Sequence, residues 1–314
     1  MKRLMGVLFK ISVSAFFIFL ITRKIDISQM IGILRNVYMP FFIAIILINY
    51  VVTFFMALRW YFVLDEFRKK ISFASVWNLS LIGLYFNIIL PTGAGGDAIK
   101  IFYITRDQEE KLKLGTSVIF DRFIGSSSTI FMAILSLLYY QRHLPVKLKI
   151  SLVFLFALVL FIWFMIFWDK LAIFTGKVFP HKIRQKLKAF YNHLRDYGIN
   201  RRVFINAFLA SIGVQVLSVY VQYLCMIMIS PAGTSPVPFP LFFIFIPIIW
   251  LSAMVPSLGG LGIREYGYLF FFKPYIGQEA AIAMALINLV LIFFQALLGG
   301  VIFLFLRPGR QDRK

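Results

Sequence analysis

The sequence contains Pro91-Thr92-Gly93-Ala94-Gly95-Gly96-Asp97-Ala98-Ile99-Lys100 and, in its second half, Pro256-Ser257-Leu258-Gly259-Gly260-Leu261-Gly262-Ile263-Arg264-Glu265. Each stretch follows a short or broken apolar run and precedes a second short apolar segment. Proline and clustered glycines break helices, and non-helical backbone at membrane depth is tolerated only where protein or a watery cavity surrounds it. The two stretches therefore predict the tips of two re-entrant helical hairpins, which cover residues 74–105 and 241–273.

Apolar residues dominate the 314-residue chain, because 61% of it is hydrophobic and only 15% is charged. Soluble proteins are about 25% charged, and apolar runs of about 18 or more residues mark membrane spans. The composition predicts an all-α polytopic membrane protein with a single integral domain. Its net charge of +20 is attributed to loops that face anionic lipid, and no nucleic-acid partner is expected.

Six full transmembrane helices are predicted in addition to the two hairpins. They cover residues 4–22, 41–60, 115–140, 150–168, 203–229 and 280–306. Two amphipathic segments, 26–37 and 169–202, predict helices that lie at the membrane interface. The first apolar run is expected to be a retained span, because Lys10 interrupts it and no small-residue cleavage site follows.

The distribution of Lys and Arg predicts the orientation. With the N-terminus inside, 23 of the 33 cations fall in inner segments and 7 in outer segments. Because cytoplasmic loops carry the excess of Lys and Arg, both termini are expected to be cytoplasmic, in a multi-pass protein of the cell membrane. The basic tail, 307–314, then lies inside.

The order of elements also predicts an internal repeat. A span, an amphipathic helix, a span, a hairpin and a span occur in 1–140 and again in 141–306. Each half has three full crossings, so the second half is inserted upside down. This is the inverted-repeat architecture of many transporters, in which broken helices form a substrate site near the midplane.

Charged residues at membrane depth are candidate binding groups, because each costs about 2.5–3.5 kcal/mol to insert. Asp97 and Lys100 are spaced to share one helix face, whereas the adjacent Arg264 and Glu265 are expected to diverge. The helix that leaves each glycine turn presents free N–H groups to an anion, and glycine lets a headgroup approach closely. The expected substrate-binding residues are Arg59, Gly95, Gly96, Asp97, Lys100, Asp121, Arg122, Gly259, Gly260, Arg264 and Glu265.

Simpler interpretations remain open for these residues. Each acid in the turns can merely neutralise a neighbouring base, and Arg59 can extend along a helix end towards the membrane surface. Amide side chains inside spans commonly join helices by hydrogen bonds. The amides concerned are Gln215, Gln222, Asn288 and Gln295.

Motifs of enzymes are missing from the sequence. There is no G-x-x-x-x-G-K-[ST] stretch, no H-E-x-x-H stretch and no histidine-based nucleophile arrangement. The single cysteine, Cys225, lies in an apolar segment, and the three histidines lie in predicted loops or interfacial segments. No catalytic residue, metal or cofactor is expected, and the chain is not expected to be an enzyme.

The quoted motifs resemble a known family. Arg59-Trp60, Pro91 through Asp97 with Lys100, Asp121-Arg122, and Pro256 through Glu265 are similar to the transmembrane region of lysylphosphatidylglycerol synthetase, also called multiple peptide resistance factor. The resemblance covers nearly the whole chain and implies movement of lipids between leaflets. The synthetase has a soluble aminoacyl-transfer domain after its membrane part, so an end at Lys314 implies a stand-alone member without aminoacyl transfer.

The expected function is that of a flippase whose polar cavity lies between the two hairpins. Its partners would be membrane lipids, namely an anionic phospholipid or a lipid-linked headgroup, and a homo-oligomer is compatible with the sequence. Two alternatives stay open: a secondary transporter of a small polar solute, and a non-transporting membrane subunit of an envelope glycolipid pathway.

Overall fold

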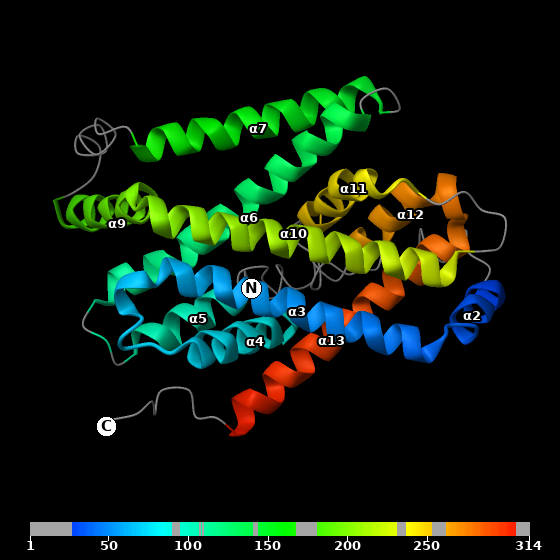
Figure 1. Cartoon of the computed structure of the whole chain (residues 1–314), viewed down its shortest axis with the longest axis horizontal. Helices are drawn as coiled ribbons and strands as arrows, with labels where there is room; N and C mark the ends of the chain where they lie inside the picture. Colours follow the sequence, from blue (N-terminus) through cyan, green and yellow to red (C-terminus); the bar gives the residue numbers. More distant parts are fainter. Residues whose placement is uncertain are drawn as a thin grey trace, which may run out of the picture. The chain divides into compact units, whose positions relative to one another are not determined.

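The fold was analysed in a computed structural model of the chain. It describes residues 27–89, 95–106, 108, 110–140, 144–167, 181–230, 237–252 and 262–305. Within these ranges all regular structure is helical, as expected (Figure 1). The predicted first span, at 4–22, lies outside the described residues.

Five described helices are long and apolar enough to cross a membrane. They are α3 (Met39–Val63), α6 (Lys111–Tyr140), α7 (Val146–Phe167), α10 (Arg201–Ile229) and α13 (Gln278–Phe305). Each coincides with a predicted span to within four residues at either end, because long apolar runs specify membrane helices with little help from tertiary contacts. The chain is therefore a helical membrane protein.

Each predicted hairpin consists of two short helices. The first contains α4 (Phe73–Ile89) and α5 (Gly95–Thr105), and the second contains α11 (Phe239–Ser252) and α12 (Ile263–Ile276). These helices have 17, 11, 14 and 14 residues, fewer than the roughly 20 that a full crossing needs. The tips, 90–94 and 253–261, lie outside the described residues, so their re-entrant course stays a prediction.

Both amphipathic segments are helical. They form α2 (Ile27–Arg35) and, in the described part of 169–202, α9 (His181–Ile199). Helix α9 packs against α6 and α7, where the hydroxyl of the buried Tyr197 donates to the carbonyl of Lys113 at 3.1 Å. Burial raises the pKa of Tyr197 far above its ordinary value. A short 3-10 helix, η1 (Asp65–Phe67), follows α3.

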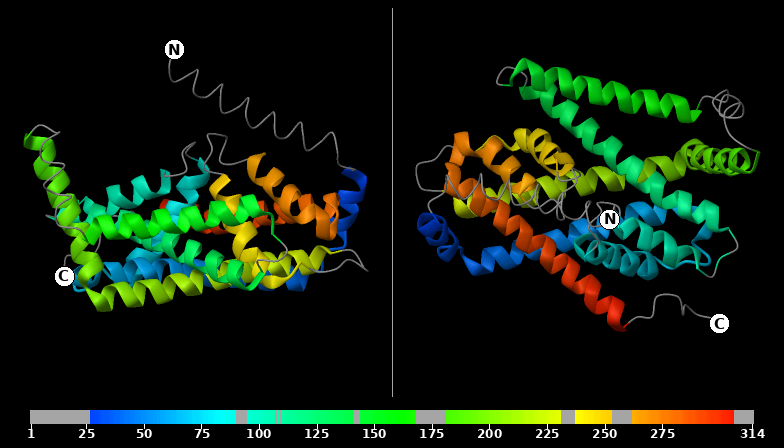
Figure 2. Two further views of the ribbon diagram at one scale, coloured as in Figure 1. Left: turned by 90° about the horizontal axis from the view of Figure 1, so that it is seen from above. Right: turned by 180° about the vertical axis from the view of Figure 1, so that it is seen from behind.

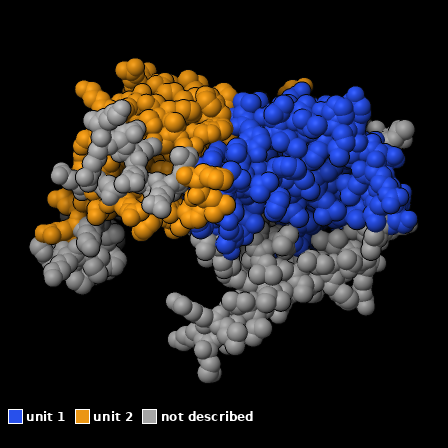
Figure 3. Space-filling view, turned by 90° about the horizontal axis from the view of Figure 1, so that it is seen from below, with its two compact units in different colours: residues 1–52, 81–96, 216–302 blue, residues 53–80, 97–215, 303–314 orange. Residues whose placement is uncertain are grey.

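The chain divides into two compact units, coloured separately in Figure 3. Unit 1 contains residues 1–52, 81–96 and 216–302, and unit 2 contains 53–80, 97–215 and 303–314. Each unit takes segments from both predicted repeats. A division by packing does not test an evolutionary or topological repeat, so the boundaries 1–140 and 141–306 stay a prediction.

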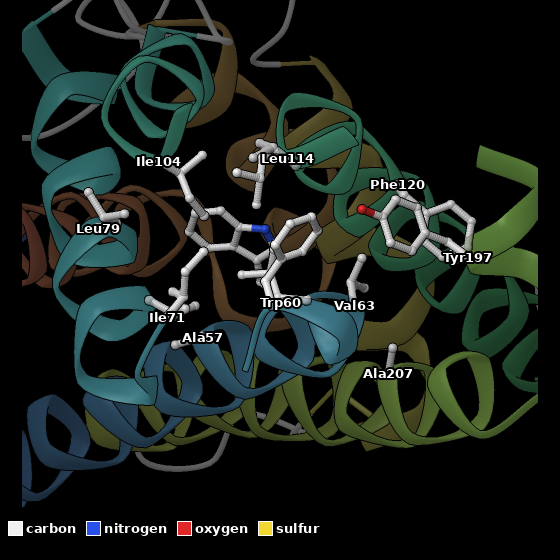
Figure 4. Close-up of a cluster of buried hydrophobic side chains, with 14 of the residues drawn as sticks. Ala57, Trp60, Val63, Ile71, Leu79, Ile104, Leu114, Phe120, Tyr197 and Ala207 are labelled. Carbon is white, nitrogen blue, oxygen red and sulfur yellow. The ribbon is translucent and has the colours of Figure 1, made fainter. Parts of the chain in front are cut away.

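The core of unit 2 surrounds a buried tryptophan (Figure 4). Trp60 is 1% exposed, and its indole N–H donates to the Ser117 hydroxyl at 3.1 Å. Phe120 lies between the rings of Trp163, at 6.0 Å between centroids, and Tyr197, at 5.5 Å. These rings join α3, α6, α7 and α9, which gives the charged groups of unit 2 a rigid apolar setting.

Unit 1 is held by close helix packing. Helices α11 and α12 lie side by side (Figure 2), with the rings of Phe245 and Phe271 stacked at 4.8 Å. At Gly299 of α13, an added Cβ would lie 2.0 Å from the carbonyl oxygen of Leu81 in α4. Such backbone contact needs glycine, and small residues at helix contacts are characteristic of membrane proteins.

Candidate functional site

Arg59 and Asp121 form a buried ion pair in unit 2. Arg59 projects from α3, and its Nε and Nη2 donate to Asp121 Oδ1 and Oδ2 at 2.6 and 3.0 Å. The two residues are 5% and 4% exposed. This two-point contact is the strongest geometry available to the pair. The interpretation that Arg59 extends along a helix end to the membrane surface is therefore wrong, because α6 provides a carboxylate in the interior.

Small residues make room for this guanidinium. A Cβ at Gly125 would lie 2.5 Å from Arg59 Nη1, and Nη1 donates to the Ser211 hydroxyl of α10 at 3.2 Å. Ser128 and Ser211 are themselves hydrogen-bonded at 2.6 Å. Sequence reasoning missed these residues, although a glycine followed by three serines in an apolar helix was a signal.

A second cluster in unit 2 contains Asp97, Lys100 and Arg122. Arg122 contacts both carboxylate oxygens of Asp97, with Nε at 2.7 Å and Nη2 at 3.0 Å. Lys100 Nζ is farther from Asp97, at 3.9 Å. The shared helix face of Asp97 and Lys100 is thus confirmed, but the closest partner of Asp97 comes from α6.

Lys100 is the cation that this arrangement leaves least compensated. Its side chain is 9% exposed, and its ammonium lies 5.3 Å from the centre of the Trp60 ring. The two clusters together contain three cations and two carboxylates, so they carry a formal charge of +1. Since both carboxylates are engaged more closely by arginine, Lys100 is the cation whose formal charge is least compensated.

The beginning of α5 shows why glycines stand there. Gly95 and Gly96 are buried, and a Cβ at Gly96 would lie 2.1 Å from the carbonyl oxygen of Gly83 in α4. The Gly96 N–H donates to the Asn87 side-chain oxygen at 2.8 Å. Part of the expected anion-binding helix end is therefore already hydrogen-bonded, and Gly96 permits two helix backbones to meet.

The beginning of α12 shows that the expected divergence of Arg264 and Glu265 is wrong. Arg264 and Glu265 do not diverge, because Arg264 Nη2 lies 2.8 Å from Glu265 Oε1. Glu265 turns back to accept the Gly262 N–H at 2.6 Å, and this places its other oxygen within reach of Arg264. Gly262 has a φ of 85°, which glycine adopts readily. Gly259 and Gly260 lie outside the described residues.

A polar chain crosses the interior of unit 1. The Tyr268 hydroxyl of α12 donates to Gln222 Oε1 of α10 at 2.8 Å, and Gln222 Nε2 donates to Asn288 Oδ1 of α13 at 2.6 Å. Gln295 Nε2 donates to the Asn49 carbonyl of α3 at 2.9 Å. The predicted helix-joining role is confirmed for Gln222, Asn288 and Gln295. Tyr268 was missed, because nothing distinguishes it from the surrounding aromatic residues.

Replacement of Tyr268 by phenylalanine tests this polar chain. Tyr268 is 0% exposed, so the change removes a donor and leaves Gln222 Oε1 without its hydrogen bond. We expect a loss of about 1–3 kcal/mol in the free energy of unfolding, measured by thermal unfolding of detergent-solubilised protein. The half-exposed Tyr220 of α10 provides a control within unit 1, and an equal effect of Tyr220→Phe would contradict the assignment.

Within the described part of the chain, no group of three or more His, Cys, Asp or Glu side chains is placed to hold a metal ion. Cys225 is buried and has a free thiol. Among the described ionic groups, a guanidinium or an ammonium can hold an anion, and a carboxylate can hold a cation or a proton.

Comparison with known proteins identifies the family. The family model described as the lysylphosphatidylglycerol synthase TM region matches residues 7–299. A UPF0104 membrane protein of Methanothermobacter thermautotrophicus is 23% identical over 301 residues, which cover 84% of this chain and 82% of that protein. A second UPF0104 membrane protein, from Methanocaldococcus jannaschii, is 24% identical over 204 residues, which cover 59% of this chain and 60% of that protein. The chain therefore belongs to the family of the lysylphosphatidylglycerol synthase transmembrane region.

Proposed function

We propose that this protein moves an anionic lipid between the leaflets of a cell membrane, and that Lys100 binds the phosphate of the lipid headgroup. The observation that carries this proposal is that the buried Lys100 has no close carboxylate partner. Its nearest carboxylate oxygen is 3.9 Å away and belongs to Asp97, which Arg122 already contacts at 2.7 Å and 3.0 Å.

A buried ammonium with few partners is costly unless a ligand completes its environment. Lysine has three N–H donors, and Lys100 makes no hydrogen bond to another described residue; its contacts are the distant Asp97 oxygen and the Trp60 ring. Burial of a charge without full pairing is unfavourable. A phosphate oxygen would supply both the missing negative charge and the missing acceptors.

The other cations of the expected site are less available. Arg59 is held by Asp121 and Ser211, and Arg264 is held by Glu265. Each of these arginines is paired with a carboxylate of its own unit. Both are also buried, at 5% and 6% exposed, and we therefore assign them to positioning. We assign phosphate binding to Lys100 with Arg122, which is likewise paired, with Asp97, but whose side chain is 47% exposed.

Membership of the family supports a lipid as the substrate, and so does the membrane setting. The acyl chains would remain in the bilayer while the headgroup crosses it. We also place both termini in the cytoplasm, on the basis of the charge bias. The predicted hairpin tips and the predicted inverted repeat remain part of this proposal, since broken helices that meet near the midplane form the substrate sites of many transporters.

The substitution Lys100→Met tests the binding role of Lys100 without removing a contact that stabilises the fold. The apolar chain preserves most of the side-chain volume, and Asp97 keeps its two contacts with Arg122. We expect at least a tenfold loss in the rate at which purified protein in liposomes exchanges a fluorescent phosphatidylglycerol between leaflets. The thermal unfolding temperature should be unchanged or higher, because a partly compensated buried charge has been removed.

Controls distinguish the alternatives. Lys100→Arg should retain part of the activity, and Lys147→Met, at an exposed lysine of α7, should retain all of it. Retained exchange in Lys100→Met would overturn the proposal, as would a fall in stability that accounts for the lost exchange. Flux of a small solute without lipid exchange in the wild type would favour a solute transporter instead.

A further inference from the structure

An apolar groove in unit 1 lies where α2 turns into α3. It has a volume of about 190 Å³, and its walls include Leu34, Val37, Met39, Phe42, Leu286 and Val290. The first four residues surround the α2–α3 turn, and the last two belong to α13. No polar side chain is among the groove's lining residues.

The turn that supplies four of the wall residues also carries polar side chains. Arg35, Asn36 and Tyr38 occupy the turn between wall residues and are all exposed, with Tyr38 at 69%. Arg35 is the one charged residue of the sequence between Asp26 and Arg59. It forms no ion pair with any residue of the described chain.

An apolar groove with an exposed cation next in sequence to one of its wall residues has the chemistry of a phospholipid site. Interfacial helices place cations and aromatic rings at the headgroup level while their apolar faces meet the acyl chains. An arginine is well suited to phosphate because its planar fork donates to two oxygens at once. The walls of the groove do not discriminate between headgroups, because they contact only the acyl chain. They also attract that chain little more than the bilayer does, since the hydrocarbon of the bilayer is as apolar as the walls.

We propose that this corner binds one anionic phospholipid, with an acyl chain in the groove and the headgroup phosphate on Arg35. Binding here is separate from transport, because it needs neither Lys100 nor a crossing of the membrane. Selectivity for the anionic headgroup resides in Arg35, and the fit of the acyl chain resides in the groove. The two parts of the ligand can therefore be tested by two different substitutions.

The test uses the full-length protein in vesicles that contain either phosphatidylglycerol or phosphatidylcholine with a photoreactive group in the acyl chain. After illumination, labelled peptides are quantified by mass spectrometry. In the wild type we expect phosphatidylglycerol to label the segments that contain residues 34–42 and 286–290. Labelling by phosphatidylcholine should be about fivefold weaker, the discrimination expected of one surface cation.

Two variants separate headgroup from tail. Arg35→Gln should lower labelling by phosphatidylglycerol to the level of phosphatidylcholine. Val290→Trp, at a side chain that is 41% exposed, should fill the groove and reduce labelling by both lipids several-fold. Matched controls are Lys147→Gln for charge and Leu297→Trp for bulk, the latter 51% exposed and two turns further along α13.

The outcomes are decisive because labelling is measured at equilibrium and does not depend on lipid exchange. Equal labelling of the groove by both lipids in the wild type would overturn the headgroup assignment, and so would a variant Arg35→Gln that behaves like the wild type. Unchanged labelling in Val290→Trp, or an equal loss in Leu297→Trp, would overturn the groove. If the wild-type protein shows no lipid exchange but is labelled as expected, the proposed lipid site is supported and only the proposed transport function is contradicted.

Discussion

Asp121→Ala is expected to lower the free energy of unfolding by about 3–5 kcal/mol, the usual cost of leaving one member of a buried ion pair without its partner. Arg59 is 5% exposed and forms two hydrogen bonds to Asp121. Without that carboxylate, the guanidinium keeps Ser211 as its hydrogen-bond partner. Thermal unfolding of the purified protein in detergent measures the effect.

A partly exposed pair of the same unit provides the control. Asp65 contacts Arg68 at 3.0 Å, and their side chains are 33% and 28% exposed. Exposed pairs contribute about 0–1 kcal/mol, so Asp65→Ala should change stability little. A double variant, Arg59→Met with Asp121→Leu, should recover most of the loss, because an apolar pair leaves no buried charge. Equal effects of Asp121→Ala and Asp65→Ala would contradict the interior placement of the pair.

Gly299→Ala is expected to destabilise unit 1 by about 1–3 kcal/mol, the range found when side-chain volume is added to a well-packed interior. The added Cβ would lie 2.0 Å from the Leu81 oxygen and 2.5 Å from its carbonyl carbon. Backbone atoms cannot rotate away as a side chain can, so α13 and α4 must separate locally. The measurement is again thermal unfolding in detergent.

Gly32 of α2 is the matched control, because an added Cβ there has no atom within 4 Å. Gly32→Ala should stabilise the protein slightly, by up to about 1 kcal/mol, since alanine is the better helix former. If Gly299→Ala were as stable as Gly32→Ala, the close approach of α4 and α13 would be wrong. Gly96→Ala should resemble Gly299→Ala, because its Cβ would lie 2.1 Å from the Gly83 oxygen.

These experiments assign different roles to residues that the sequence grouped together. Arg59 and Asp121 compensate each other in the interior of unit 2, whereas Lys100 has no carboxylate partner that is as close. The sequence predicted all three as binding residues, because an ionisable side chain in an apolar segment is a functional candidate whatever its partner. All three are buried, and what distinguishes them is pairing, which cannot be read from a single position.

The sequence by itself determined the class of the protein, the course of the described spans and the presence of the short helices α4, α5, α11 and α12. Apolar runs specify membrane helices residue by residue, and proline with glycine stops a helix locally. These signals require no knowledge of which helices meet. The same holds for α2 and α9, whose amphipathic pattern is a property of each segment alone.

Tertiary structure decided which charges meet. Asp97 is nearest in sequence to Lys100 but pairs more closely with Arg122, 25 residues away, and Arg59 finds Asp121 at a separation of 62. Glu265 pairs with its neighbour Arg264 because the Glu265 side chain turns back to accept a hydrogen bond from the Gly262 N–H. Such choices depend on the distances between packed helices, and a few ångströms there determine whether a charge is neutralised within the protein or left to bind a ligand.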